Sequence, residues 1–345
     1  MTSTIAQLLN GGIQSTLIFG DPFTPFKTRI VRPVPHACEP RMQDVTGADY
    51  GTRVTKTFQY DADLVLRTFI VVQLAKTPNT SAYVSASGTS CIEQAEDLGH
   101  VLCEEVKFQI GSVTHQKWDG NFLHVLQSLM LPDEQQHEEM TGRTCDGCGH
   151  KASLQERPYQ NQQFFIEVPA WYAPMCYGHP RQQKQYGNAF PLVACQLSEP
   201  QLIVSFRRRS QCFKILDSSV TGLSGNDLSS SSLPVCSMHK VSMLFEYAFL
   251  DDTTRQIFAV TPHYFLIRQM QVAKHSVTAS SSAHTTSFEP RFNHMVQQLW
   301  WYYRSSSSET TSKNEWFNFA GGETGDSVYG VFAGDFFQTM EMKYN

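Results

Sequence analysis

The segment Phe164–Phe206 reads FFIEVPAWYAPMCYGHPRQQKQYGNAFPLVACQLSEPQLIVSF, and its order of apolar and polar residues decides the fold. A first apolar run at 164–169 leads into the aromatic pair at 171–172, and a polar loop rich in Pro, Gly and Gln follows. Two further apolar runs, 189–192 and 200–206, close the segment. Short β-forming runs separated by Pro and Gly are typical of antiparallel strands, because each strand crosses the sheet once and must then turn. The segment therefore predicts an antiparallel sandwich.

Other stretches support an all-β chain with short helices in its loops. In Phe58–Leu74 most apolar side chains share one parity, which is the alternation of a strand. Residues 106–110 alternate in the same way. Residues 121–131 instead have helical spacing, with Asn121 as the expected N-cap.

Composition and charge exclude several classes of protein. Of the 345 residues, 41% are hydrophobic, enough for a sizeable core, and only 17% are charged, below the usual quarter or so. The net charge of −5 gives no broad basic field, so we expect no direct binding to nucleic acid. No apolar run reaches the roughly 18–20 residues of a membrane span. The first residues lack the pattern of a signal peptide, which predicts a cytosolic product.

The cysteines leave one metal hypothesis open. Nine cysteines, an odd and scattered set, favour free thiols over a disulfide framework. Cys145 and Cys148 form a Cys-x-x-Cys pair, and together with Cys176 and His179 they could hold a structural zinc ion. The alternative is that a long loop has simply accumulated cysteines. Asn79 begins an N-glycosylation triplet, whose use the sequence leaves open.

The remaining candidate site residues have structural interpretations. Asp61 and Asp63 precede a predicted strand, and we interpret them as turn residues rather than as an acid–base pair. His115 and His124 could be ligands or bases, and we interpret them as surface or packing residues. The three arginines at 207–209 are interpreted as the solvated end of a strand. We expect no catalytic, cofactor-binding or metal-binding residues.

Several segments, in the same order, resemble the major capsid proteins of nucleocytoplasmic large DNA viruses. They are 164–206, 106–131 and, most specifically, 246–271, where two predicted strands (241–250 and 264–272) flank a polar turn at 251–255. The residues that carry this last resemblance are Tyr247, Phe249, Leu250, Asp251, Arg255, Phe258, His263, Tyr264, Leu266 and Ile267.

The resemblance implies a double jelly roll, two antiparallel β-sandwiches side by side. It divides the chain into an N-terminal arm (1–24), a first jelly roll (25–209), a Ser-rich linker (210–240) and a second jelly roll (241–345). A jelly roll needs about eight strands, and fewer can be found after residue 240. The second jelly roll is therefore expected to be incomplete, so the chain is either a shortened member of the family or one part of a longer product.

The function that the resemblance implies is structural, not enzymatic. Homotrimers would form pseudo-hexagonal capsomers of an icosahedral shell, in contact with neighbouring capsomers and minor capsid proteins, above an internal viral membrane. The protein would belong to the virion and assemble in the host cytoplasm. Two alternatives remain: a minor capsid or scaffold paralogue, and a jelly-roll carbohydrate-binding module that uses the aromatic residues at 300–303.

Overall fold

The computed structural model describes only part of the chain. The described residues are 35–74, 90–95, 97–130, 140–142, 162–173, 189–217, 237–265, 267, 269–276, 287–294, 296, 299–302 and 316–317. Strands dominate these residues and pair antiparallel throughout, which confirms the predicted fold class.

The first sheet has the order β1-β11-β3-β7, and a short strand, β8, also pairs with β3. Because β3 and β11 lie inside this sheet, both can be long and rich in apolar residues. The strands are β1 (His36–Val45), β3 (Leu64–Leu74), β7 (Gln162–Glu167), β8 (Phe190–Pro191) and β11 (Met238–Leu250).

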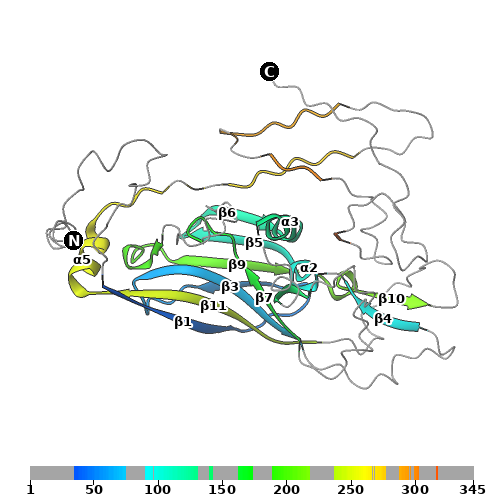
Figure 1. Ribbon diagram of the computed structural model, residues 1–345, viewed down its shortest axis with the longest axis horizontal. Helices are drawn as coiled ribbons and strands as arrows, with labels where there is room; N and C mark the ends of the chain where they lie inside the picture. Colours follow the sequence, from blue (N-terminus) through cyan, green and yellow to red (C-terminus); the bar gives the residue numbers. More distant parts are fainter. Residues whose placement is uncertain are drawn as a thin grey trace, which may run out of the picture.

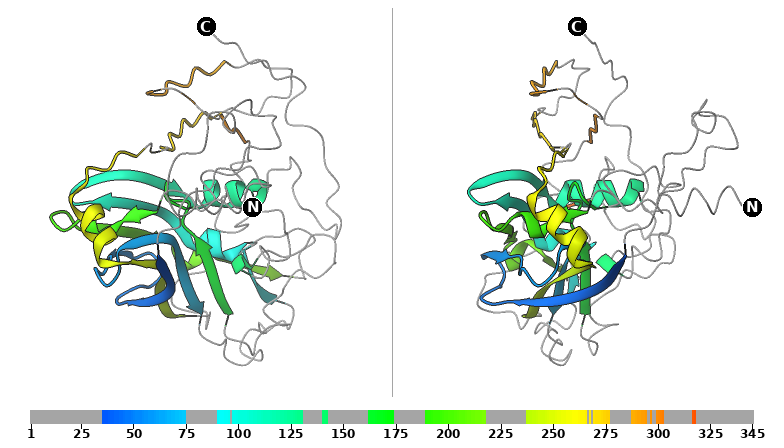
Figure 2. Two further views of the ribbon diagram at one scale, coloured as in Figure 1. Left: turned by 60° about the vertical axis from the view of Figure 1, so that its left-hand side comes forward. Right: turned by 90° about the vertical axis from the view of Figure 1, so that its left-hand side faces the viewer.

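The second sheet has the order β2-β9-β5-β6 and faces the first, so the two sheets form separate layers (Figure 2). A small third sheet of β4 and β10 lies at the end of the sandwich opposite the helix α5 (Asp252–Val260) (Figure 1). These strands are β2 (Arg53–Thr57), β4 (Ser90–Gln94), β5 (Cys103–Ile110), β6 (Val113–Asp119), β9 (Pro200–Phe206) and β10 (Phe213–Asp217).

Alternation along the strands builds one core between the two sheets. In β3, Ile70 and Val72 are fully buried, and they belong to the same cluster as Val106 of β5 and Val204 of β9. The aromatic pair after β7, Trp171 and Tyr172, is buried in this cluster as well. The segment that predicted the sandwich therefore contributes both strands and core aromatics.

Short helices lie between the strands and after β11. Those within the described residues are α2 (Leu98–Leu102), α3 (Gly120–Met130), α5 and the 3-10 turns η4 (Leu192–Ala194) and η5 (Arg209–Gln211). The helix predicted at 121–131 is confirmed as α3, but its cap is not Asn121. The carboxylate of Asp119 accepts a hydrogen bond from the backbone N–H of Phe122 at 2.8 Å, so Asp119 caps the helix and strand β6 passes directly into it.

Strand β11 lies in a different place from the one expected. From the sequence, residues 241–250 are expected in the second jelly roll, but β11 pairs along its length with β1 on one side and β3 on the other. Val241 lies opposite Val72 and Phe245 opposite Thr68, so the strand completes the first sandwich. Alternation identified the strand correctly but cannot specify its partner, because any apolar face of the right width fits it.

The segment after β11 differs from expectation too. The polar residues at 251–255, expected as a turn, begin helix α5. Tyr264–Val272 was expected to be a strand, but its described residues have no strand assignment. Phe265 instead packs against Trp171 of the first sandwich, with ring centroids 4.2 Å apart. Within the described residues, no helix is long and apolar enough to cross a membrane.

Candidate functional site

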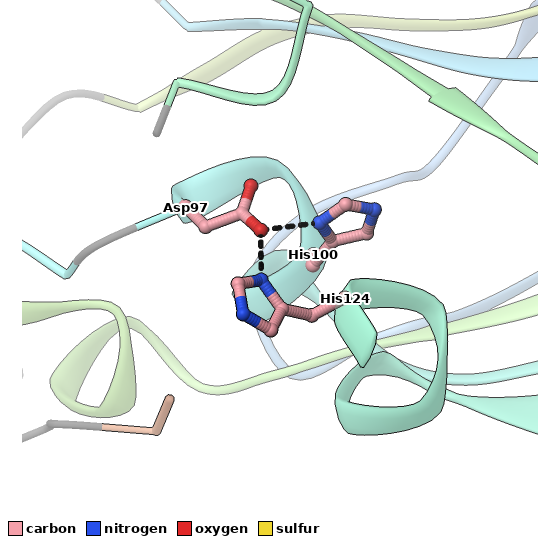
Figure 3. Close-up of side chains that lie close together, drawn as sticks. All are labelled: Asp97, His100 and His124. Carbon is pink, nitrogen blue, oxygen red and sulfur yellow. Dashed lines mark hydrogen bonds and ion pairs between the residues drawn. The ribbon is translucent and has the colours of Figure 1, made fainter. Parts of the chain in front are cut away.

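Three ionisable side chains meet in the interior between helices α2 and α3 (Figure 3). Asp97 directly precedes α2, His100 lies one turn into that helix, and His124 comes from α3. The side chains of Asp97 and His100 are fully buried, and that of His124 is 8% exposed. A buried carboxylate with two imidazoles is the group of described residues best suited to bind an ion or a proton.

One carboxylate oxygen joins the three residues. Oδ2 of Asp97 lies 2.6 Å from Nδ1 of His100 and is also hydrogen-bonded to Nδ1 of His124. In Figure 3 both rings point their Nδ1 atoms at this oxygen. Asp97 has a backbone φ of 52°, a left-handed conformation that aspartate tolerates better than most residues. This turn allows the side chain at the start of α2 to face α3.

Two aromatic residues from much later in the chain close over this region. The ring of Phe317 stacks on His124, with centroids 3.9 Å apart and planes within 7° of parallel. The indole N–H of Trp316 donates to the backbone oxygen of Gln211 at 2.8 Å. The guanidinium of Arg207 lies over the Trp316 ring, 3.8 Å from its centroid. Residues 316–317 are therefore anchored to the first sandwich and cover His124.

Sequence reasoning identified one member of the cluster and missed the other two. His124 was considered as a ligand or base and interpreted as a packing residue, whereas Asp97 and His100 were not considered. The three-residue spacing of Asp97 and His100 was the available signal, because it places both side chains on one side of a helical turn. His115 lies elsewhere, on β6, where partial burial lowers its pKa.

The aspartates before β3 hold the end of β11. Asp63 is buried, and its Oδ2 accepts a hydrogen bond from the backbone N–H of Leu250 at 2.8 Å. Its Oδ1 lies 3.0 Å from Nε of Arg255 in α5. Asp61 forms a longer ion pair with Arg41, at 3.7 Å. Asp63 thus links β3, β11 and α5, a role more extensive than the turn predicted from sequence.

The arginines after β9 are not all solvated, as the sequence analysis had expected. Arg207 is buried beneath Trp316, and this burial lowers its pKa. Arg208 is exposed, and Arg209 lies over the ring of Tyr50 at 5.5 Å from the centroid. The first arginine of the three therefore packs in the interior and supports residues 316–317.

Four cysteines, Cys38, Cys103, Cys195 and Cys212, are free thiols, and two of them are inert because they are fully buried. Cys103 and Cys212 are buried, which raises the pKa of each thiol to about 12. The residues of the zinc hypothesis, Cys145, Cys148, Cys176 and His179, lie outside the described residues. Asn79 lies outside them as well.

A buried glutamate, Glu167, lies on the outer face of the first sheet. Its neighbour Ile166 belongs to the core, so alternation directs Glu167 to the opposite face, beside Phe69. Burial raises its pKa to about 7, with a further contribution from Glu246, while Arg67 acts in the opposite direction. Glu167 therefore takes up a proton near neutral pH in the folded protein.

We expect Glu167 to lower the free energy of unfolding by about 2 kcal/mol as pH rises from 5 to 8. The unfolded chain ionises this carboxyl near its ordinary pKa, whereas in the folded protein its pKa is about 7. Glu167→Gln, which resembles the protonated form, should remove this loss and be the more stable protein at pH 8. Urea unfolding at both pH values measures the effect. Glu199→Gln, at an exposed position, should follow the wild type. The prediction would be contradicted if the free energy of unfolding changed with pH by the same amount in the wild type and in Glu167→Gln.

Comparison with known proteins identifies the family. The family described as "Major capsid protein N-terminus" matches residues 24–251, about two thirds of the chain. The chain belongs to this family. The match ends one residue after β11, in agreement with the place of that strand in the first sandwich.

Individual members of the family are distant in sequence. "Capsid protein 1" of Acanthamoeba polyphaga mimivirus is 22% identical over 304 residues, which cover 87% of this chain and 48% of that protein. The "Major capsid protein" of Phaeocystis pouchetii virus is 26% identical over 326 residues, covering 87% and 58%. The chain thus spans about half the length of these relatives.

Solved structures agree on the fold. A quasi-atomic structure of the PBCV-1 virus capsid matches with a TM-score of 0.51 and 20% identity, over 71% of this chain and 50% of that one. The crystal structure of PBCV-1 VP54, fitted into a reconstruction of the virophage Sputnik, gives a TM-score of 0.50 and 19% identity. These likenesses support the jelly-roll architecture.

Proposed function

We propose that the chain is a structural part of a viral shell, the N-terminal portion of a major capsid protein of a large DNA virus. The observation that carries this proposal is the family match over 24–251, which coincides with the antiparallel sandwich that ends at β11. The protein acts through its surfaces rather than through catalysis, and it belongs to the virion. Its shell is icosahedral, and assembly takes place in the host cytoplasm.

The proposed assembly is a homotrimer. Two jelly rolls in each subunit give a trimer six similar sandwiches, so its outline is pseudo-hexagonal and it can tile a lattice with neighbouring capsomers. The residues after β11 would supply the second jelly roll together with a further segment of the gene product. Minor capsid proteins are the expected additional partners, and an internal viral membrane lies beneath the shell.

The oligomeric state tests the proposal directly. We expect a product extended to the length of the relatives to elute with a mass three times that of one subunit in size exclusion with light scattering, and to show hexagonal outlines in negative stain. The present chain, of 39.0 kDa per subunit, serves as the comparison. A stable monomer of the extended product would contradict the capsomer proposal.

An observation favours one alternative enough to test it in parallel. Trp301 and Tyr302 are 61% and 42% exposed, as a surface that stacks on sugar rings would require. A glycan array with the extended product addresses this carbohydrate-binding alternative. Binding that is lost in Trp301→Ala would support it, whereas a trimer without glycan binding supports the capsid role.

A further inference from the structure

We propose that Asp97, His100 and His124 form a structural binding site for a divalent metal ion of the zinc type, which fastens helix α2 to helix α3. This proposal departs from the expectation, drawn from sequence, that the chain has no metal-binding residues. It is independent of the capsid function and concerns how the first sandwich is held together at one end.

The donor set fits such an ion. Imidazole nitrogens and a carboxylate oxygen are ligands that zinc accepts in proteins. One donor atom from each of the three residues lies within 4.8 Å of the others, and all three residues are buried. A bound water would supply the fourth donor. An ion would also place positive charge beside a carboxylate that is fully removed from water.

The observed hydrogen bonds already hold the donors in position. Nδ1 of His100 lies 2.6 Å from Oδ2 of Asp97. Two ligands of a tetrahedral zinc ion lie roughly 3.3 Å apart, because each is about 2.0–2.2 Å from the metal. For this pair of donors, the separation has to increase by less than about 1 Å to admit the ion. Each imidazole would then carry its proton on Nε2 and present Nδ1 to the metal.

The surroundings suit a site that stabilises structure. The Phe317 ring lies flat against His124 and covers it. The two helices flank one β-hairpin, since α2 leads into β5, α3 follows β6, and Glu105 of β5 pairs with Asp119 of β6. A shared ion would add a side-chain link between the helices beyond the end of this ladder, and would hold His124 in the position on which Phe317 stacks.

The zinc content of the purified chain tests the proposal. The purified chain, incubated with zinc chloride and dialysed against metal-free buffer, is expected to retain one ion per chain by mass spectrometry of the metal. His100→Asn and His124→Asn should each lose it. His115→Asn, a histidine outside the cluster, should keep it. So should the double variant Cys145→Ser with Cys148→Ser, which tests the separate cysteine hypothesis. Absence of zinc from the wild type, or its retention in both cluster variants, overturns the proposal.

Two measurements on the wild type keep the test valid if the cluster variants do not fold. Chelation is expected to lower its Tm by roughly 5 °C, and added zinc should restore it. Cobalt in place of zinc should give visible bands of nitrogen and oxygen ligation without a thiolate charge-transfer band. An unchanged Tm after chelation would count against this site. So would a cobalt-substituted protein whose spectrum shows a thiolate charge-transfer band.

Discussion

Phe58→Ala is expected to lower the free energy of unfolding by about 3–5 kcal/mol, the largest loss among the substitutions proposed for this chain. Phe58 is 1% exposed and lies between the two sheets. Its ring is 4.6 Å from that of Phe245 in β11 and 5.8 Å from that of Phe108 in β5. Removing it leaves a cavity that neither sheet can fill, because each is fixed by its own hydrogen-bond ladder.

Urea unfolding followed by tryptophan fluorescence measures this loss. Leu197→Ala is the matched control, since Leu197 is fully exposed and its removal should change stability by less than about 0.5 kcal/mol. Equal effects of the two substitutions would mean that Phe58 does not join the sheets in solution.

Gly120→Ala is expected to cost about 3 kcal/mol, although it replaces glycine by the best helix former. In an exposed helix the same change would stabilise by about 1 kcal/mol. Here a Cβ would lie 2.3 Å from the backbone oxygen of Cys103 and 2.4 Å from that of His100. Backbone oxygens cannot rotate away as a side chain can, so α3 would have to move away from α2. The cost of this clash exceeds the gain in helix propensity, and the substitution is therefore destabilising.

Comparing the Tm of Gly120→Ala with that of Gly99→Ala separates the effect of the clash from the effect that any glycine-to-alanine substitution in a helix would have. A Cβ at Gly99 would meet the backbone of Thr141 at 3.0 Å, a milder contact, so its loss should be smaller. A rise in the Tm of Gly120→Ala would show that the close approach of α2 and α3 is absent in solution. The prediction also bears on the metal proposal, because this approach brings His100 and His124 together.

Local patterns were sufficient wherever neighbouring residues decide the structure. The alternation in 58–74 and 106–110 predicted β3 and β5, and the apolar spacing of 121–131 predicted α3. Strand and helix periodicity follow from the direction of each Cβ along the chain, so they can be read without tertiary contacts. The exact start of α3 was less accessible, since Asp119 and Asn121 are both good capping residues.

Residue patterns alone predicted the all-β class, and the ordered resemblance predicted the capsid family. The sheet that β11 joins could not be predicted from its own residues, because pairing is a contact between segments far apart in the chain. The same reason explains the cluster of Asp97, His100 and His124. Spacing relates the first two, but His124 joins them through the packing of α3 on α2, which no local pattern specifies.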